Sequence, residues 1–230
     1  MKIINLTRQQ PYTINKKICF AINIKSLKEI WIFNCSQGCQ HMLAKKNIKI
    51  SHISKIIITE LNTENISGLI GLLSSLSLIK RIKEINIYSP KGIDKYLEFS
   101  KKYSQTNFNY SLYFHILKTG LISNNSIYQV YAFANKLKFD FTILFKEKHG
   151  KFKSSKAKNF HLISGPLYGQ LKQGSSFLLP DGFIILGTNF KSNNVSGTKI
   201  CFTINQYSTR NSIEIIKNSK NIKNLVQSLK

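Results

Sequence analysis

The stretch at residues 56–78 limits the fold more than any other part of the chain. Its first three residues, Ile56-Ile57-Ile58, are apolar and β-branched, which is typical of a buried strand. A polar segment follows at 59–65, and the Leu-rich run at 66–78 has the length and composition of a helix. This strand, polar elbow and helix predict half of an α/β unit, and open α/β sheets keep their sites at such elbows.

Other segments repeat the alternation of strand and helix. Residues 18–24 and 29–34 predict a hairpin, and residues 84–88 predict a further strand. A helix is expected from Gly38 to about Lys46, and an amphipathic helix with Pro90 at its beginning is expected over 89–99. The remaining expected elements are a first strand within 2–11, β-rich runs at 112–117, 127–134 and 139–145, a hairpin at 178–185 with an Asp181-Gly182 turn, and a helical tail at 208–230.

Length and composition favour a single globular domain over residues 1–230. A chain of 230 residues with 42% hydrophobic residues can bury a core. No segment has the apolar length of a membrane span, and the basic N-terminus lacks the features of a signal peptide, so we expect no membrane association. Residues 146–158 are rich in Lys and Ser and predict a solvated basic loop or arm.

The charge of the chain indicates a polyanionic partner. Lys and Arg number 34 and Asp and Glu number 10, for a formal net charge of +24, so nucleic acid is the expected partner. The alternative is drift in an AT-rich genome, and the presence of only three arginines, Arg8, Arg81 and Arg210, agrees with that bias. AT-rich codons would supply Asp and Glu as readily as Lys, however, so the shortage of acids favours RNA binding.

The four cysteines predict neither a disulfide framework nor a metal site. Cys19, Cys35, Cys39 and Cys201 are too few for the framework of a secreted chain of this length. Cys35 and Cys39 lie four residues apart, and no nearby pair of ligands completes a zinc site. We expect reduced cysteines that pack in the core.

Three motifs resemble ribonuclease Z, a family of the metallo-β-lactamase superfamily. Thr59 and the run Gly68-Leu69-Ile70-Gly71-Leu72-Leu73 flank the elbow as Thr and Gly-Leu-x-Gly-Leu-Leu flank the family's metal-binding loop. Residues 34–40 are similar to the family's Asp-Cys-Gly-Glu-Gly-Thr-Gln, with Asn34 and Gln37 at the two acidic positions. The most diagnostic motif is Gly-Pro-Leu-Tyr-Gly at 165–169. The resemblance implies a metallo-β-lactamase-like αβ/βα sandwich, C-terminally truncated because the closing segment with the last metal-binding histidine is absent.

The metal ligands that the resemblance implies are replaced in this chain. The family's loop reads Thr-His-x-His-x-Asp-His; here Glu60, Asn62 and Asn65 stand at the histidine positions and Glu64 at the aspartate. Asn205 stands where the family has the aspartate that bridges two metals. Amide oxygens are poor zinc donors, and a water that is not bound to a metal keeps a pKa far above neutral pH. We therefore predict that the family's zinc is lost, with no metal site and no catalytic residue.

Two of the residues at the elbow could have another role. Glu60 and Glu64 could form an oxygen-rich Mg²⁺ or Mn²⁺ site, but a favourable interaction with a helix N-terminus is the simpler interpretation. The leading hypothesis is a catalytically inactive homologue of the tRNA 3′-processing endonuclease that binds tRNA or precursor tRNA. The alternatives are an active endonuclease with a rearranged or partner-completed metal site, and a remnant without a biochemical role.

Five lysines are the candidate RNA-binding residues: Lys151, Lys153, Lys156, Lys158 and Lys172. The first four lie in or at the end of the basic segment, and the fifth follows the Gly-Pro-Leu-Tyr motif, so all could contact phosphates. The resemblance also implies a homodimer, or pairing with an active homologue. Residue usage and similarity to plastid reading frames of algae indicate an organelle-encoded protein of the plastid (chloroplast), with a bacterial cytoplasm as the alternative.

Overall fold

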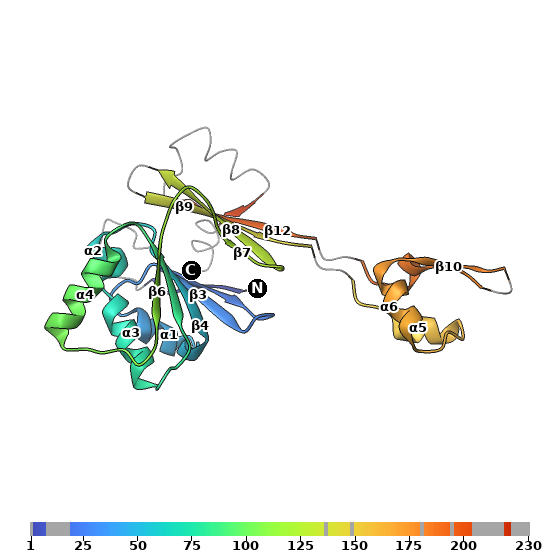
Figure 1. Cartoon of the computed structure of the whole chain (residues 1–230), viewed down its shortest axis with the longest axis horizontal. Helices are drawn as coiled ribbons and strands as arrows, with labels where there is room; N and C mark the ends of the chain where they lie inside the picture. The colour runs from blue at the N-terminus through green and yellow to red at the C-terminus, as the bar shows by residue number, and fades with distance from the viewer. Residues whose placement is uncertain are drawn as a thin grey trace. The chain divides into compact units, whose positions relative to one another are not determined.

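The computed structural model describes residues 2–7, 19–135, 138–147, 150–179, 182–193, 196–203 and 219–221. The described residues form two compact units (Figure 1). Unit 1 comprises Met1–Asn124, Gln129–Ile143 and Ile200–Lys230, and unit 2 comprises Asn125–Tyr128 and Leu144–Lys199.

The first sheet of unit 1 has six strands in the order of the chain. They are β1 (Lys2–Asn5), β2 (Phe20–Ile24), β3 (Glu29–Phe33), β4 (Ile53–Ile57), β5 (Ile85–Ser89) and β6 (Leu112–Ile116). The pairs β1–β2 and β2–β3 are antiparallel, which confirms the predicted hairpin, and the pairs from β3 to β6 are parallel. Phe33 pairs with Ile57, so β3 and β4 end side by side. This register brings the residues after both strands to one edge of the sheet.

Helices cover one face of this sheet and confirm the α/β prediction. They are α1 (Cys39–Lys45), α2 (Thr63–Ile66), α3 (Leu69–Leu78) and α4 (Ile93–Ser104), with a short 3-10 helix, η1 (Ile50–His52), before β4. Leu72, Leu73 and Leu76 of α3 are fully buried in one core with Ile32 and Ile56 of the sheet. Helices α1, α3 and α4 lie together beside the sheet (Figure 1).

The helix expected over 89–99 begins later than predicted. α4 starts at Ile93 and extends to Ser104. Gly92 precedes it with a φ of 119°, in the left-handed region that favours glycine, so the chain turns at Gly92 before the helix can start. Pro90 therefore lies in the turn and not in the first helical turn.

The second sheet has the order β13-β12-β9-β8-β7. Its strands are β7 (Gly120–Asn124), β8 (Tyr128–Asn135), β9 (Lys138–Phe145), β12 (Thr198–Phe202) and β13 (Lys220–Asn221). Aromatic rings join the two sheets: Phe33 of β3 lies 5.7 Å from Phe141 of β9, and Phe20 of β2 lies 4.9 Å from Phe202 of β12, between ring centroids. The strand pair β12–β13 is parallel, so Lys220 and Asn221 are not part of the helical tail predicted at 208–230; the rest of that tail, apart from Ser219, lies outside the described residues.

Unit 2 has its own small core. It contains α5 (Ser154–Asn159), α6 (Pro166–Gln173), the hairpin of β10 (Ser176–Leu178) and β11 (Ile184–Leu186), and the 3-10 helix η2 (Gly187–Phe190). The antiparallel hairpin was predicted, although Asp181 of its turn lies outside the described residues. The segment 146–158, predicted as a loop or arm, is helical from Ser154 because Ala157 is buried against Leu162, Leu171, Ile185 and Phe190.

None of the helices in the described part of the chain is long and apolar enough to cross a membrane.

Candidate functional site at the β4 elbow

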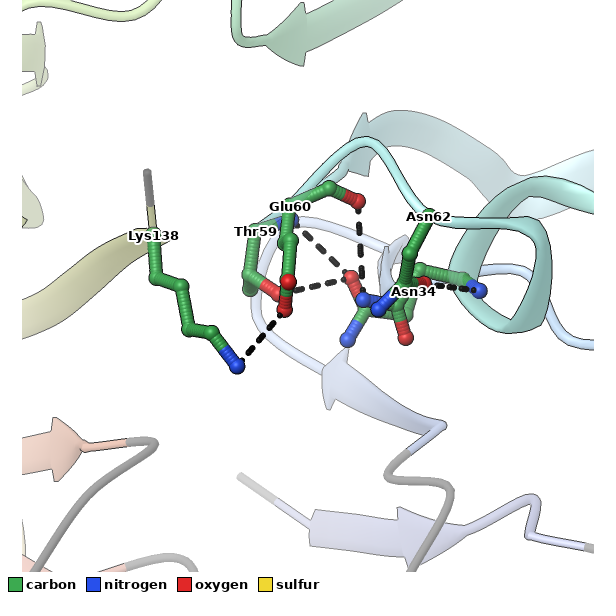
Figure 2. A network of polar contacts seen from close by, with 6 residues as sticks. Asn34, Thr59, Glu60, Asn62 and Lys138 are labelled. Atoms are coloured by element: carbon green, nitrogen blue, oxygen red, sulfur yellow. Dashed lines mark hydrogen bonds and ion pairs between the residues drawn. The ribbon is translucent and has the colours of Figure 1, made fainter. Parts of the chain in front are cut away.

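Asn34 holds the beginning of the elbow. It follows β3 with a φ of 57°, a left-handed conformation that Asn adopts more readily than most residues, and its side chain is buried. Its Oδ1 accepts two hydrogen bonds from Thr59, one from the backbone N at 2.9 Å and one from Oγ1 at 3.0 Å (Figure 2). Thr59 is buried as well, so Asn34 satisfies two donors that water does not reach.

The elbow itself is closed by its own amide side chains. Asn62 is the N-cap of α2, and its Oδ1 accepts a hydrogen bond of 2.8 Å from the backbone N of Asn65. The Asn65 Nδ2 lies 3.5 Å from the backbone O of Glu60 and donates to it. Both amides, at positions where the resemblance implies histidines, therefore stabilise the local backbone.

Glu60 has a cation as its partner. Lys138, the first residue of β9, places its Nζ 3.1 Å from Glu60 Oε2, with the side chains 38% and 22% exposed (Figure 2). The next residue, Phe139, donates its backbone N to the O of Thr59 at 3.0 Å. The second sheet thus contacts the elbow through one ion pair and one backbone hydrogen bond.

The elbow is also fixed to the loop after β3. Cys35 donates its backbone N to the O of Asn65 at 2.7 Å and accepts at its O from the N of Gly68 at 2.8 Å. A Cβ on Gly68 would overlap the backbone O of Ser36, so only glycine fits where α3 starts. These contacts explain why the glycine of the elbow's flank is present although the ligands are not.

Two buried thiols lie beneath Asn34. The Cys19 Sγ donates to the backbone O of Asn34 at 3.2 Å and lies 3.8 Å from the Cys39 Sγ. The hydrogen bond with Cys39, together with burial, raises the pKa of the Cys19 thiol. The pKa of Cys39 is also raised, and all four cysteines are free and buried as predicted. These thiols are protonated packing groups.

The residues at the elbow do not fit a zinc ion. No group of three or more His, Cys, Asp or Glu side chains suited to hold a metal occurs among the described residues. Glu64 lies half-buried in the first turn of α2, a favourable place for a carboxylate at a helix N-terminus. Asn205 and His149 lie outside the described residues. At the positions where the resemblance implies imidazoles, the elbow has the carboxylate of Glu60 and the amides of Asn62 and Asn65, and Glu60 is paired with the ammonium group of Lys138.

The structure brings the elbow residues together but keeps the predicted RNA-binding lysines in unit 2. Lys151, Lys153, Lys156, Lys158 and Lys172 are all exposed. Sequence reasoning missed Lys138, because nothing in its local sequence marks it and its partner Glu60 is 78 positions earlier. The sequence could indicate only that Glu60, a rare acid in so basic a chain, would lie near some cation.

Comparison with known proteins identifies relatives of two kinds. No family model matches the chain. The protein named Ycf56 of Pyropia yezoensis is 42% identical over 205 residues, which cover 87% of this chain and 78% of that protein. The ribonuclease Z of Nostoc punctiforme is 31% identical over 185 residues, which cover 79% of this chain and 58% of that enzyme. The chain thus spans about three fifths of the length of the ribonucleases Z that it matches.

Solved structures agree with the predicted fold. The human short-form tRNase Z superposes with a TM-score of 0.53 at 24% identity, over 62% of this chain and 64% of that one. A long-form RNase Z from yeast gives a TM-score of 0.51 at 16% identity, over 87% of this chain and 28% of that one. These matches confirm the metallo-β-lactamase-like sandwich. The chain therefore belongs to the family of the Ycf56 proteins and is a homologue of ribonuclease Z.

Proposed function

We propose that this protein is a ribonuclease Z-like protein that binds tRNA or precursor tRNA and does not cleave it by the zinc mechanism of its relatives. The observation that carries the proposal is that the side chains of the elbow are already engaged in hydrogen bonds and an ion pair. Asn34, Asn62 and Asn65 make hydrogen bonds within the elbow, and Glu60 pairs with Lys138. A zinc site at the elbow would need imidazole or free carboxylate groups at positions 60, 62 and 65, and none is available there.

Electrostatics at the elbow supports the loss of the metal. The ammonium of Lys138 lies 3.1 Å from Glu60 Oε2 and already neutralises that carboxylate. A divalent cation in contact with Glu60 would meet the ammonium group at close range, and like charges at a few ångströms repel. Three of the four ligand positions of the loop motif lack a free ligand for zinc. Asn62 and Asn65 carry neither an imidazole nor a carboxylate, and the carboxylate of Glu60 is already paired.

The charge of unit 2 supports RNA binding. Its sequence contains nine lysines and two acidic residues, Glu147 and Asp181. The five lysines predicted to bind RNA are exposed, so their ammonium groups can reach phosphates without a change of the fold. Such contacts release counterions, and binding should weaken steeply as salt rises.

The first experiment combines metal analysis with a cleavage assay on precursor tRNA. We expect protein without stoichiometric zinc, no cut at the trailer junction, and binding of tRNA at low salt that is lost at high salt. Stoichiometric metal together with cleavage would overturn the proposal and favour an active endonuclease with a rearranged site. Cleavage that exceeds the activity of an added active homologue alone would favour a partner-completed site. Protein with no affinity for tRNA at any salt concentration would favour the remnant.

A charge-matched pair of variants tests where the RNA binds. Replacing Lys151, Lys153, Lys156 and Lys158 with Gln should weaken tRNA binding. The slope of the logarithm of the binding constant against the logarithm of the salt concentration should become shallower by about 1 for each phosphate contact that is lost. The control replaces four exposed lysines of unit 1, Lys45, Lys46, Lys49 and Lys102, with Gln. Equal weakening by both sets would show that only net charge matters.

The same proposal extends to compartment and assembly. Two relatives, in Pyropia yezoensis and Porphyra purpurea, carry the name Ycf56, which is used for reading frames of red algal plastid genomes, and this supports synthesis in a plastid. Assembly as a homodimer, or with an active homologue, follows from the family alone. Sedimentation of the purified protein with and without that homologue tests it.

A further inference from the structure

Unit 2 contains an open cavity of about 340 Å³. We call it the Phe160 groove and define it by Lys156, Asn159, Phe160, Phe183, Asn189 and Phe190, which line it together with residues of β11. Its volume is at the lower end of the range for small-ligand sites. The lining combines aromatic rings, amide groups and a cation, and the elbow contributes nothing to it.

Two phenyl rings at the groove are exposed although an apolar core is available in the same unit. Phe183 is 73% exposed and Phe160 is 54% exposed, whereas Phe190 is 2% exposed and belongs to the core. Phe160 meets Phe190 edge to face, with 5.4 Å between ring centroids, so its orientation is fixed while part of the ring is accessible to solvent. Exposed apolar side chains that gather in a groove mark a binding surface.

The polar groups of the groove match the chemistry of a nucleotide. The Lys156 Nζ lies 5.9 Å from the centroid of the Phe190 ring, so a cation is held at the aromatic surface. Asn159 and Asn189 are exposed and carry amide groups, which can donate to and accept from the edge of a base. Aromatic faces for stacking, amides for base edges and a lysine for a phosphate are the usual means of binding unpaired RNA.

We propose that the Phe160 groove binds one unpaired nucleobase of an RNA, stacked on Phe160 or Phe183, with Lys156 at the adjacent phosphate. The inference rests on the proposed RNA binding and adds a preference for single-stranded segments to it. Charge selects RNA as the occupant, because a unit with nine lysines and two acidic residues attracts a polyanion.

The test compares two RNA probes, a single-stranded oligoadenylate and a blunt duplex with the same number of nucleotides. We expect the double variant Phe160→Ala/Phe183→Ala to bind the single strand about fivefold or more weakly than the unmodified protein. Its affinity for the duplex and its salt dependence should be unchanged, because no lysine is removed. Leu178→Ala is the matched control, since Leu178 is 72% exposed on neighbouring β10 and does not line the groove.

Two further measurements separate stacking from folding. Phe183→Ala alone removes a ring that is 73% exposed, so a folded variant is expected from its circular dichroism spectrum. Phe183→Tyr should retain the affinity for the single strand, because a tyrosine ring also stacks. If the double variant binds oligoadenylate as tightly as the unmodified protein, the groove is not a base site, while RNA binding by the lysines stands. If the unmodified protein binds tRNA at low salt but not oligoadenylate, the groove proposal fails alone, and if it binds neither tRNA nor either probe, the proposed function fails as well.

Discussion

Asn34 combines a left-handed backbone with a side chain that satisfies two buried donors of Thr59. An aspartate, which the resemblance implies at this position, could accept the same two bonds. Alanine has neither the side-chain oxygen nor the tolerance for a positive φ.

The first prediction concerns the stability that Asn34 contributes. Asn34→Ala should lower the free energy of unfolding by about 2–4 kcal/mol, because it leaves the Thr59 donors unpaired and strains the backbone. Asn34→Gly should cost less, since glycine accepts the positive φ and only the hydrogen bonds are lost. Urea denaturation measures both, with Gln37→Ala at an exposed neighbour as the control. Equal stability of Asn34→Ala and the control would contradict this account of the elbow.

The sequence allowed the elbow residues to be located but not their contacts. Glu60, Asn62 and Asn65 were identified by position as replaced ligands, while the N-cap role of Asn62 and the bond from Asn65 to the backbone depend on where α2 begins. Lys138 could not be predicted at all, because a partner in another sheet is set by tertiary packing.

At the scale of elements, the start of α3 depends on a close approach of backbone to backbone. Gly68 has no space for a Cβ because of the Ser36 O, whereas a Cβ on Gly71 would meet only the movable end of the Gln40 side chain, 2.8 Å away. The two glycines thus differ in what surrounds them, although both are part of one helical motif.

The second prediction uses this difference. Gly68→Ala should destabilise the protein by about 1–3 kcal/mol, because the elbow must move away from the loop after β3. Gly71→Ala should be neutral or stabilising, since alanine favours the helix by up to about 1 kcal/mol. Thermal or urea unfolding of the two variants measures the contrast. A similar effect of both substitutions would show that helix propensity, and not the contact of Gly68 with the Ser36 backbone, determines the change in stability.

The third prediction concerns the packing of α3 against the loop between α4 and β6, which contains Tyr110. Tyr110 donates its OH to the backbone O of Leu73 at 2.8 Å, and burial raises the pKa of its phenol. A phenol with a raised pKa in the folded protein stabilises it below the unfolded pKa of about 10 and loses that contribution as pH rises above it. Stability should therefore fall above about pH 10, and less steeply in Tyr110→Phe. Tyr103→Phe, at an 81% exposed tyrosine, should leave the pH dependence unchanged.

Local patterns predicted the elements whose residues alternate or repeat clearly, such as the β2–β3 hairpin and the β4 elbow. They failed where tertiary contacts decide. β7 (Gly120–Asn124) has a mixed composition and exists because it pairs with β8, and α5 is held by the burial of Ala157. Neither the strand that pairs with β7 nor the core residues around Ala157 can be predicted from the local sequence.

At the scale of the whole molecule, the two units have separate cores. The core of unit 2 is five buried residues with a few partly buried neighbours, and that of unit 1 extends over the sheet and three helices. Because small cores bury less apolar surface, unit 2 should be the less stable of the two. The cysteines offer a way to observe this, since all four belong to unit 1 and none to unit 2.

The fourth prediction is that unit 2 unfolds at a lower urea concentration than the one at which the thiols of unit 1 become reactive. In mild urea, circular dichroism should report a first loss of structure in unit 2 while the thiols stay unreactive toward a disulfide reagent, because Cys19, Cys35, Cys39 and Cys201 are fully buried. The thiols should react only at the second transition. A single transition in which both signals change together would show that the two units unfold cooperatively.

If a metal was lost from the elbow as proposed, the ion pair of Lys138 and Glu60 makes that loss difficult to reverse in evolution. Restoring a histidine at position 60 would leave an unpaired ammonium facing the new ligand, and removing Lys138 first would leave a carboxylate without its partner. Return to a metal-binding elbow therefore requires coordinated changes in two sheets, with intermediates that have neither the pair nor the metal.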